Sequence, residues 1–161
     1  MQRLTKQQTN RSRRGAAMVE FAIIAPVFLT LVIGLLEAGQ ALRAANVMAA
    51  AVREGGRLAA MDWNDFVPEG FTPNDKVISD VRNFLIASGL PGEEAVIQIT
   101  SAEGEDEGEE FDLTNTSNNY RLFKISIEIE YDEVSTFPST FMYGQTLTSS
   151  LTFRAVRSHA G

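Results

Sequence analysis

The residues of this chain that could do chemistry are few, and they gather at two places. One is Glu20, a single acid at the edge of an apolar run that follows two arginines and Gly15. The other is a stretch with seven Asp and Glu residues between Glu103 and Asp112. A carboxylate beside apolar surface can pair with a cation where the dielectric constant is low. A cluster of carboxylates can bind a hard cation such as calcium.

The sequence offers little for catalysis. It contains no cysteine, which excludes disulfides, thiolate nucleophiles and thiolate metal ligands. The only histidine, His159, stands close to the C-terminal end, a poor place for a general base. The sequence contains no phosphate-binding glycine loop, nucleophile elbow or HExxH motif. We therefore expect a protein that is not an enzyme and that has no cofactor.

The charge is distributed unevenly along the chain. Residues 1–15 contain five Lys and Arg residues and no acid, whereas the whole chain has a net charge of −7, so the remainder is strongly acidic. An acidic body argues against nucleic-acid binding. A basic segment directly before an apolar run is typical of the cytoplasmic side of a membrane.

The apolar run predicts a membrane-spanning helix. Residues 21–36 are apolar except for Thr30, but this is short for a span, which needs about 20 residues. Counting from Ala16 makes the segment long enough, provided that Glu20 is tolerated. Pro26 is expected to bend the helix. Residues 1–14 are polar and without periodicity, and we expect no regular structure in them.

The helical pattern continues to about Ala60. Small residues recur at steps of three and four, which predicts one helical face that a partner backbone can approach closely. This face comprises Ala38, Ala41, Ala45, Ala49, Val52, Gly56 and Ala59. An alternative is two helices with a break at Gly55-Gly56, because glycine weakens a helix.

The remainder predicts a small α+β domain. A loop over residues 63–75 precedes a helix from Lys76 to Ala87, capped by Asn74 or Asp75, which ends before Gly89. Three strands are expected in AVIQITS, RLFKISIEIEY and LTSSLTFRAVRS. The alternation places Ile125, Ile127, Ile129 and Tyr131 on one face of the second strand, and Leu151, Phe153 and Ala155 inward on the third. The fold class is therefore α+β: a long N-terminal transmembrane helix, then one helix and a three-stranded antiparallel sheet.

The acidic stretch 103–112 lies between the first two strands. We expect a solvated loop, because the ligand spacing of a calcium-binding EF-hand is absent. The alternative is a membrane-tethered or secreted binding module that holds calcium in this loop. Asn115 begins an Asn-Thr-Ser triplet that fits a glycosylation acceptor, but such short matches are common by chance.

The basic leader and its apolar run allow three interpretations: a cleaved signal peptide, a plain membrane anchor or a prepilin-type leader. A signal peptide would be cut near Ala41 and would leave Glu20 unexplained. In a prepilin, cleavage falls before the apolar run, between Gly15 and Ala16, and Glu20 becomes the fifth residue of the mature chain.

The segment from residue 13 to residue 61 resembles the TadE-like family of pseudopilins of the tight-adherence (Flp pilus) machinery. The resemblance is carried by RRG followed by AAMVEF, by an apolar run with an early proline and by a downstream alanine- and arginine-rich helix containing VREGGR. It is weaker beyond about residue 65. A TadG-like or other Tad pseudopilin shares the N-terminal motif, but the short C-terminal region favours a TadE-like protein.

The resemblance implies a structural component of pilus assembly that is cut by a prepilin peptidase between Gly15 and Ala16. It implies that Glu20, with Phe21 beside it, directs assembly, because the fifth-residue glutamate of type IV pilins is thought to pair with the N-terminal amine of a neighbouring subunit. The expected partners are the peptidase, other pilins or pseudopilins, the Tad assembly machinery and membrane lipid, but no nucleic acid.

The expected organisation has three parts. Residues 1–15 form a basic cytoplasmic leader, residues 16–61 a transmembrane and amphipathic helix, and residues 62–161 an extracytoplasmic α+β domain. The positive-inside rule places the N-terminus in the cytoplasm. The resemblance places the chain in the inner (cytoplasmic) membrane of a bacterium as a single-pass protein.

Overall fold

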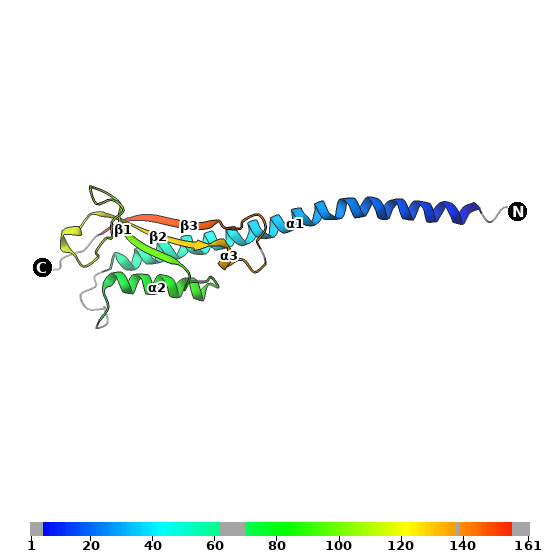
Figure 1. Cartoon of the computed structure of the whole chain (residues 1–161). Coiled ribbons are helices and arrows are strands. Elements are labelled where there is room, and N and C mark those ends of the chain that lie inside the picture. Colours follow the sequence, from blue (N-terminus) through cyan, green and yellow to red (C-terminus); the bar gives the residue numbers. More distant parts are fainter. Residues whose placement is uncertain (1–4, 62–69, 138, 156–161) are drawn as a thin grey trace. The chain divides into compact units, whose positions relative to one another are not determined.

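The structure is a computed structural model that describes residues 5–61, 70–137 and 139–155; for residues 5–14 it describes the backbone alone. The chain divides into two compact units, Met1–Ala38 and Gly39–Gly161. Each unit is described separately. Within the described residues the elements follow the order α1, α2, β1, η1, β2, α3 and β3 (Figure 1).

The N-terminal element is α1, Thr5–Ala59. Its end agrees with the sequence prediction, but its start corrects the expectation that residues 1–14 lack regular structure. The segment that follows Thr5 contains no glycine or proline before Gly15 and is rich in Gln and Arg, which favour helix. Because it extends a helix that already exists, it avoids the cost of nucleation. The helix also continues through Pro26, and the Thr30 hydroxyl donates a hydrogen bond to the Pro26 carbonyl at 2.9 Å.

The second unit contains the predicted three-stranded antiparallel sheet. Its strands are β1 (Val96–Ser101), β2 (Leu122–Glu130) and β3 (Thr146–Arg154), in the order β1-β2-β3. Ile127, on the central strand, is paired with Ile97 of β1 and with Ser149 of β3. The second half of α1 and α2 cover one face of this sheet (Figure 1). The α+β fold class is thereby confirmed.

Helix α2 spans Pro73–Ala87 and ends where the sequence predicts, with Gly89 in the left-handed region at φ 79°. Its start corrects the predicted cap. The N-cap is Thr72, whose side chain accepts from the Asp75 backbone while the Asp75 carboxylate accepts from the Thr72 backbone. Pro73 then occupies the first helical position, which needs no N–H donor. Most of the predicted loop before Thr72, residues 63–69, lies outside the described residues.

Two short helices complete the unit, the 3₁₀ helix η1 (Thr116–Asn118) and α3 (Tyr131–Val134). The core lies between the two layers. Its buried apolar side chains come from both helices and from the inner face of the sheet: Ala44, Met48, Ala51 and Val52 of α1, Val77, Val81 and Leu85 of α2, Ile97 and Ile99 of β1, and Phe123, Ile125, Ile127 and Ile129 of β2.

The small-residue face of α1 is only partly the face predicted. Val52, Gly56 and Ala59 are buried, but Ala38 and Ala45 are exposed. The buried apolar residues of α1 begin instead at Ala44, because the sheet and α2 both pack on α1 and bury a broader stripe than the single row of small residues.

The alternative of two helices with a break at Gly55-Gly56 is wrong, since α1 continues through both glycines. Their role is close packing. A Cβ at Gly55 would lie 2.6 Å from a methyl carbon of Val81, and a Cβ at Gly56 would lie 2.2 Å from the ring of Phe153. Two different neighbours therefore need these positions to lack a side chain.

The third strand is less buried than predicted. Phe153 is half-buried and Ala155 is buried, but Leu151 is 38% exposed. Because β3 is an edge strand of the sheet, its inward side chains lie at the rim of the core.

Candidate functional site

The four predicted site residues, Gly15, Ala16, Glu20 and Phe21, all lie on α1 and are exposed. Phe21 is 71% exposed. The structure places them on consecutive turns of one helix, so their spacing is set by the helix alone. No other element of Met1–Ala38 that the structure describes contributes to this site.

Glycine at position 15 is not required by the packing of this chain. A Cβ built there meets no atom within 4 Å, and the backbone is helical, where any residue fits. Glycine also destabilises a helix interior by about 1 kcal/mol relative to alanine. The fold therefore gives no reason for this glycine, in contrast to Gly55 and Gly56.

Glu20 has no hydrogen-bond or ion-pair partner among the residues that the structure describes, and its side chain is exposed. Its neighbours along the helix are apolar and equally exposed: Val19 at 63%, Phe21 at 71% and Ile23 at 69%. A carboxylate among such side chains is costly once they are removed from water, unless a cation pairs with it. The geometry leaves the Glu20 carboxylate open to a partner from another chain.

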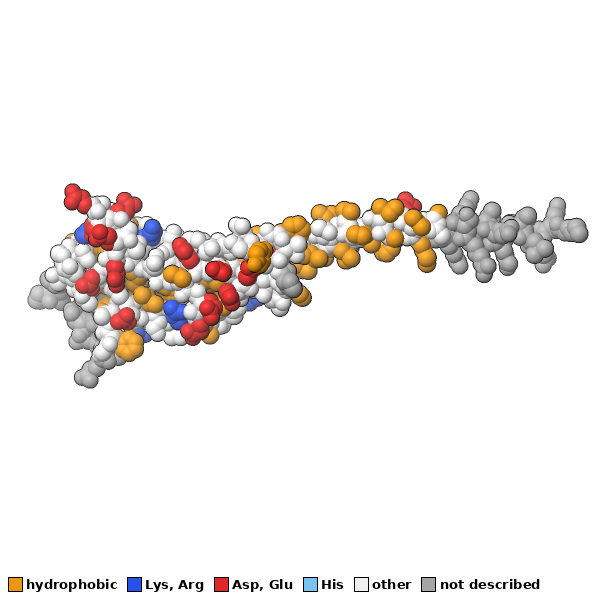
Figure 2. Space-filling view, in the orientation of Figure 1, with side chains coloured by type: hydrophobic (Ala, Val, Ile, Leu, Met, Phe, Trp, Pro, Cys, Tyr) orange, Lys and Arg blue, Asp and Glu red, His pale blue; other side chains and the backbone are white. Residues whose placement is uncertain are grey.

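The helix around Glu20 has the composition of a membrane span. Within the described residues, the segment Gly15–Ala59 contains one helix long and apolar enough to cross a membrane. Between residues 18 and 36, most of its large apolar side chains are left uncovered by the chain itself, and Figure 2 shows apolar side chains gathered along the helix. They are Met18, Val19, Phe21, Ile23, Ile24, Val27, Phe28, Leu29, Leu31, Ile33, Leu35 and Leu36. So large an uncovered apolar surface needs a nonaqueous environment.

The acidic stretch 103–112 is the second candidate site, and it is more ordered than a solvated loop. It folds back along the outer edge of β1, where the Phe111 N–H donates to the Ile99 carbonyl at 3.0 Å and the Ser101 N–H donates to the Glu109 carbonyl at 2.8 Å. Phe111 is buried and stacks on Phe123, with ring centroids 5.2 Å apart. The segment is therefore part of the fold.

Arg121 binds the turn of this acidic segment. Its guanidinium pairs with Asp106 and donates to the Glu103 carbonyl at 3.1 Å, while the Glu103 carboxylate accepts from the Leu122 N–H at 2.9 Å. The hydrogen bond from Arg121 holds the pKa of Asp106 below its ordinary value, and the same contact raises the pKa of Arg121. Two of the seven acids are thus used to hold the segment in place.

Asn74 ties the same segment to α2. Its amide nitrogen donates to the Phe111 carbonyl at 2.7 Å, and its amide oxygen accepts from the Leu113 N–H at 2.9 Å. Asn74 is buried. The sequence had suggested Asn74 only as a helix cap, because its spacing from residues 111 and 113 carries no local signal.

Nothing in this region forms a metal site. Within the described ranges, no group of three or more His, Asp or Glu residues is arranged to hold a metal ion. The alternative of a calcium-binding module therefore has no ligand set in the described part of the chain.

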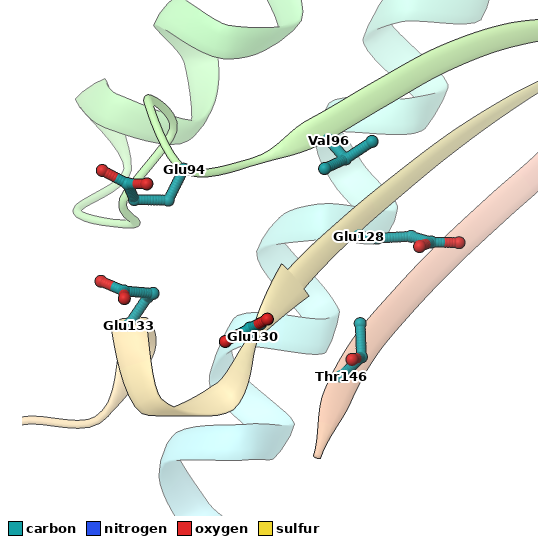
Figure 3. Close-up of a pocket in the computed structure, with 6 residues that line it drawn as sticks. All are labelled: Glu94, Val96, Glu128, Glu130, Glu133 and Thr146. Carbon is teal, nitrogen blue, oxygen red and sulfur yellow. The ribbon is translucent and has the colours of Figure 1, made fainter. Parts of the chain in front are cut away.

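A second gathering of acids lines a shallow hollow of about 330 Å³ on the sheet face opposite the helices. Its lining residues are Glu94, Val96, Glu128, Glu130, Glu133 and Thr146. Figure 3 shows the Glu94 and Glu133 carboxylates on one side of the hollow and that of Glu128 over β3 on the other. Because these carboxylates do not converge, the hollow is an acidic surface rather than a cation site.

A single uncovered apolar helix joined to a polar α+β body is the architecture of a protein anchored in a membrane by one N-terminal segment. Residues 15–57 match the family model described as TadE-like protein. The N-terminal segment of the chain is therefore TadE-like, and the resemblance found in the sequence is confirmed over these residues. No curated protein and no solved structure matches the chain.

Proposed function

We propose that this protein is a TadE-like minor pseudopilin, a structural component needed to assemble Tad-type pili. The observation that carries the proposal is the family match, which begins at Gly15, the residue before the predicted cleavage point. It extends over the apolar helix and ends at residue 57, next to the two closely packed glycines. The matched segment thus contains the cleavage point, Glu20 and the apolar run together.

In this proposal a prepilin peptidase cuts between Gly15 and Ala16, and the apolar helix stays attached to the mature chain. Two observations support the cut. Gly15 has no packing role, and its surroundings are open, as a peptidase substrate requires. Cleavage also removes every positive charge of residues 1–15 and creates a new amino group at Ala16.

Glu20 then pairs with the N-terminal amine of another subunit. Two opposite charges 4 Å apart attract by about 4 kcal/mol at an effective dielectric constant of 20, against about 1 kcal/mol in water. A subunit with its carboxylate unpaired among apolar side chains is penalised, so the pairing favours one register of assembly. Phe21 lies beside this contact and adds exposed apolar surface to it.

The proposed location is the inner membrane of a bacterium. The basic leader stays in the cytoplasm, residues 16–36 span the bilayer, and the acidic body lies on the extracytoplasmic side. The proposed domain boundaries are those of the sequence prediction: a leader at 1–15, the N-terminal helix at 16–61 and the α+β domain at 62–161. The proposed partners are the peptidase, other pilins or pseudopilins and the Tad machinery.

The deciding experiment is the mass of the mature N-terminus, measured on membranes of a host that carries its prepilin peptidase. We expect a chain that starts at Ala16. Gly15→Leu should block the cut, whereas Gly39→Leu should not, although both glycines stand in open helical surroundings. A chain that starts near Ala41 would instead indicate a cleaved signal peptide, and an uncut leader would indicate a plain anchor; either result would refute the proposal.

The role of Glu20 needs a separate measurement, because cleavage and assembly are different steps. Glu20→Gln keeps the shape of the side chain and removes its charge. We expect normal cleavage but reduced recovery of the protein with other pilus components after crosslinking in membranes. Glu105→Gln, a change of the same kind at an exposed acid of the body, should leave recovery unchanged. Equal recovery of the Glu20 variant and the wild type would exclude the pairing role.

A further inference from the structure

The segment between α3 and β3 exposes three aromatic side chains close together in the sequence. Residues 135–145 contain no Lys, Arg, Asp or Glu. Within them Phe137 is 61% exposed, Phe141 55% and Tyr143 75%. Folded proteins rarely expose several large aromatic side chains close together unless the surface has a function. We call residues 135–145 the aromatic loop.

Hydrogen bonds to α3 hold residues at both ends of the aromatic loop. The Asp132 carboxylate accepts from the Ser139 hydroxyl and, at 3.2 Å, from the Gly144 N–H. The base of the loop is closed by the Tyr131 N–H, which donates to the Gln145 carbonyl at 2.8 Å. Tyr131 itself is fully buried.

The aromatic loop is also fastened to α1 close to the apolar run. The Thr136 N–H donates to the Gln40 side-chain oxygen at 3.1 Å. Gln40 follows Leu36, the last residue of the apolar run, by four positions. Four residues reach at most about 14 Å even when fully extended, whatever the arrangement of the two units. The loop is therefore fastened to a residue that must stay near the end of any span made by the run.

We propose that the aromatic loop is a second, shallow membrane contact, in which Phe137 and Tyr143 lie at the headgroup level of the bilayer that holds the apolar helix. The proposal rests on the membrane anchoring of the proposed function. Aromatic side chains favour this interface because their rings are apolar on one part and polar on another, and they form belts at the ends of membrane spans.

The neighbouring charges fix the kind of lipid contact. Asp132, Glu133 and Glu130 adjoin the loop, and no Lys or Arg lies within it. Anionic headgroups would be repelled, so the contact depends on the aromatic rings and works on a zwitterionic bilayer. This distinguishes the aromatic loop from a basic patch that binds acidic lipid.

The test uses the full chain, whose lack of cysteine allows single labelling sites. Phe137→Cys and Tyr143→Cys are labelled with a polarity-sensitive fluorophore and reconstituted in phosphatidylcholine vesicles. Glu107→Cys is the matched control, because it is exposed on the acidic segment at the other end of β2. Leu29→Cys, in the apolar run, reports on the anchor. Quenching is measured with lipids that carry a shallow spin label and with aqueous iodide.

We expect the shallow spin label to quench the probes at 137 and 143 at least threefold more than the probe at 107, with iodide showing the reverse order. Addition of anionic phosphatidylglycerol should not increase the quenching by lipid. If the probe at residue 29 is exposed to lipid but the probes at 137 and 143 are exposed to water, the inference is wrong, although membrane anchoring by the apolar helix still holds. Aqueous exposure at residue 29 as well would overturn the anchor and the inference with it.

Discussion

The junction between the acidic segment and α2 depends on one side chain, Asn74, and removing it should cost much of the stability of the folded body. The change is Asn74→Ala. It deletes the donor that meets the Phe111 carbonyl at 2.7 Å and the acceptor that meets the Leu113 N–H at 2.9 Å. Phe111 and Leu113 are both buried, so neither backbone group can turn to water without displacing a core residue.

The size of the effect follows from these two bonds. A buried backbone group left without a partner costs about 1–3 kcal/mol, so two such groups cost about 2–6 kcal/mol. Folded domains are stable by only about 5–15 kcal/mol. Asn74→Ala should therefore remove a large fraction of the free energy of unfolding and strongly lower the urea concentration at the unfolding midpoint.

The assay is urea unfolding of the full chain in detergent, followed by near-ultraviolet circular dichroism from the aromatic core. We expect a lower midpoint with an unchanged slope, which reports stability rather than compactness. The control is Asn115→Ala, which removes an exposed amide that caps η1 and should cost about 1 kcal/mol or less. A loss below about 0.5 kcal/mol for Asn74→Ala, the range of an ordinary surface substitution, would refute this account of the junction.

Two further changes test the remaining contacts of the body. Gly56→Ala should lower the free energy of unfolding by about 1–3 kcal/mol through overpacking against the Phe153 ring, despite the better helix propensity of alanine. Measured by urea unfolding, this loss should disappear when Gly56→Ala is made in a Phe153→Ala background. The control Gly39→Ala, in open space, should not destabilise the protein. Asp106→Asn should remove a contribution to the free energy of unfolding that the wild-type protein has at neutral pH, because the pKa of Asp106 is lowered from 3.8 in the fold. In the wild type that contribution is lost as the pH falls through the pKa of Asp106 in the folded state. The urea unfolding curves of the two proteins should therefore differ at pH 7 and converge only below about pH 3.8. Curves that already coincide at pH 7 would count against the Arg121 contact.

The long helix, α2 and the three strands were predictable because each has a local signal, whereas η1 and α3 were not predicted, and Tyr131, expected in the second strand, begins α3 instead. The alternation of Ile125, Ile127 and Ile129 predicts the central strand, and all three are buried. The end of α2 was predictable from Gly89 for the same reason. Its start was missed by three residues, since Thr72 and Asp75 act as a reciprocal pair and each alone resembles an ordinary turn residue.

The contacts between distant residues were not predictable. Nothing near residue 74 indicates that its amide will meet residues 111 and 113, and nothing near Gly56 indicates that Phe153 will lie against it. The acidic segment is a loop whose acids are mostly exposed, as predicted, but its attachment to β1 and to the core was not predictable for the same reason. Its charges dominate the pattern, whereas Phe111, a single apolar residue, determines its place in the core.

The glycines of α1 give the clearest separation of fold from function. At Gly56 an added methyl group would meet a ring 2.2 Å away, so the fold alone accounts for glycine there. At Gly15 the same methyl group would meet no atom, so glycine destabilises the helix there without allowing any closer contact. Packing within the described chain therefore does not account for glycine at position 15, which stands inside the helix α1. The proposed peptidase cut before Ala16 would account for it, and Gly15→Leu tests this against Gly39→Leu, because neither glycine is needed for packing.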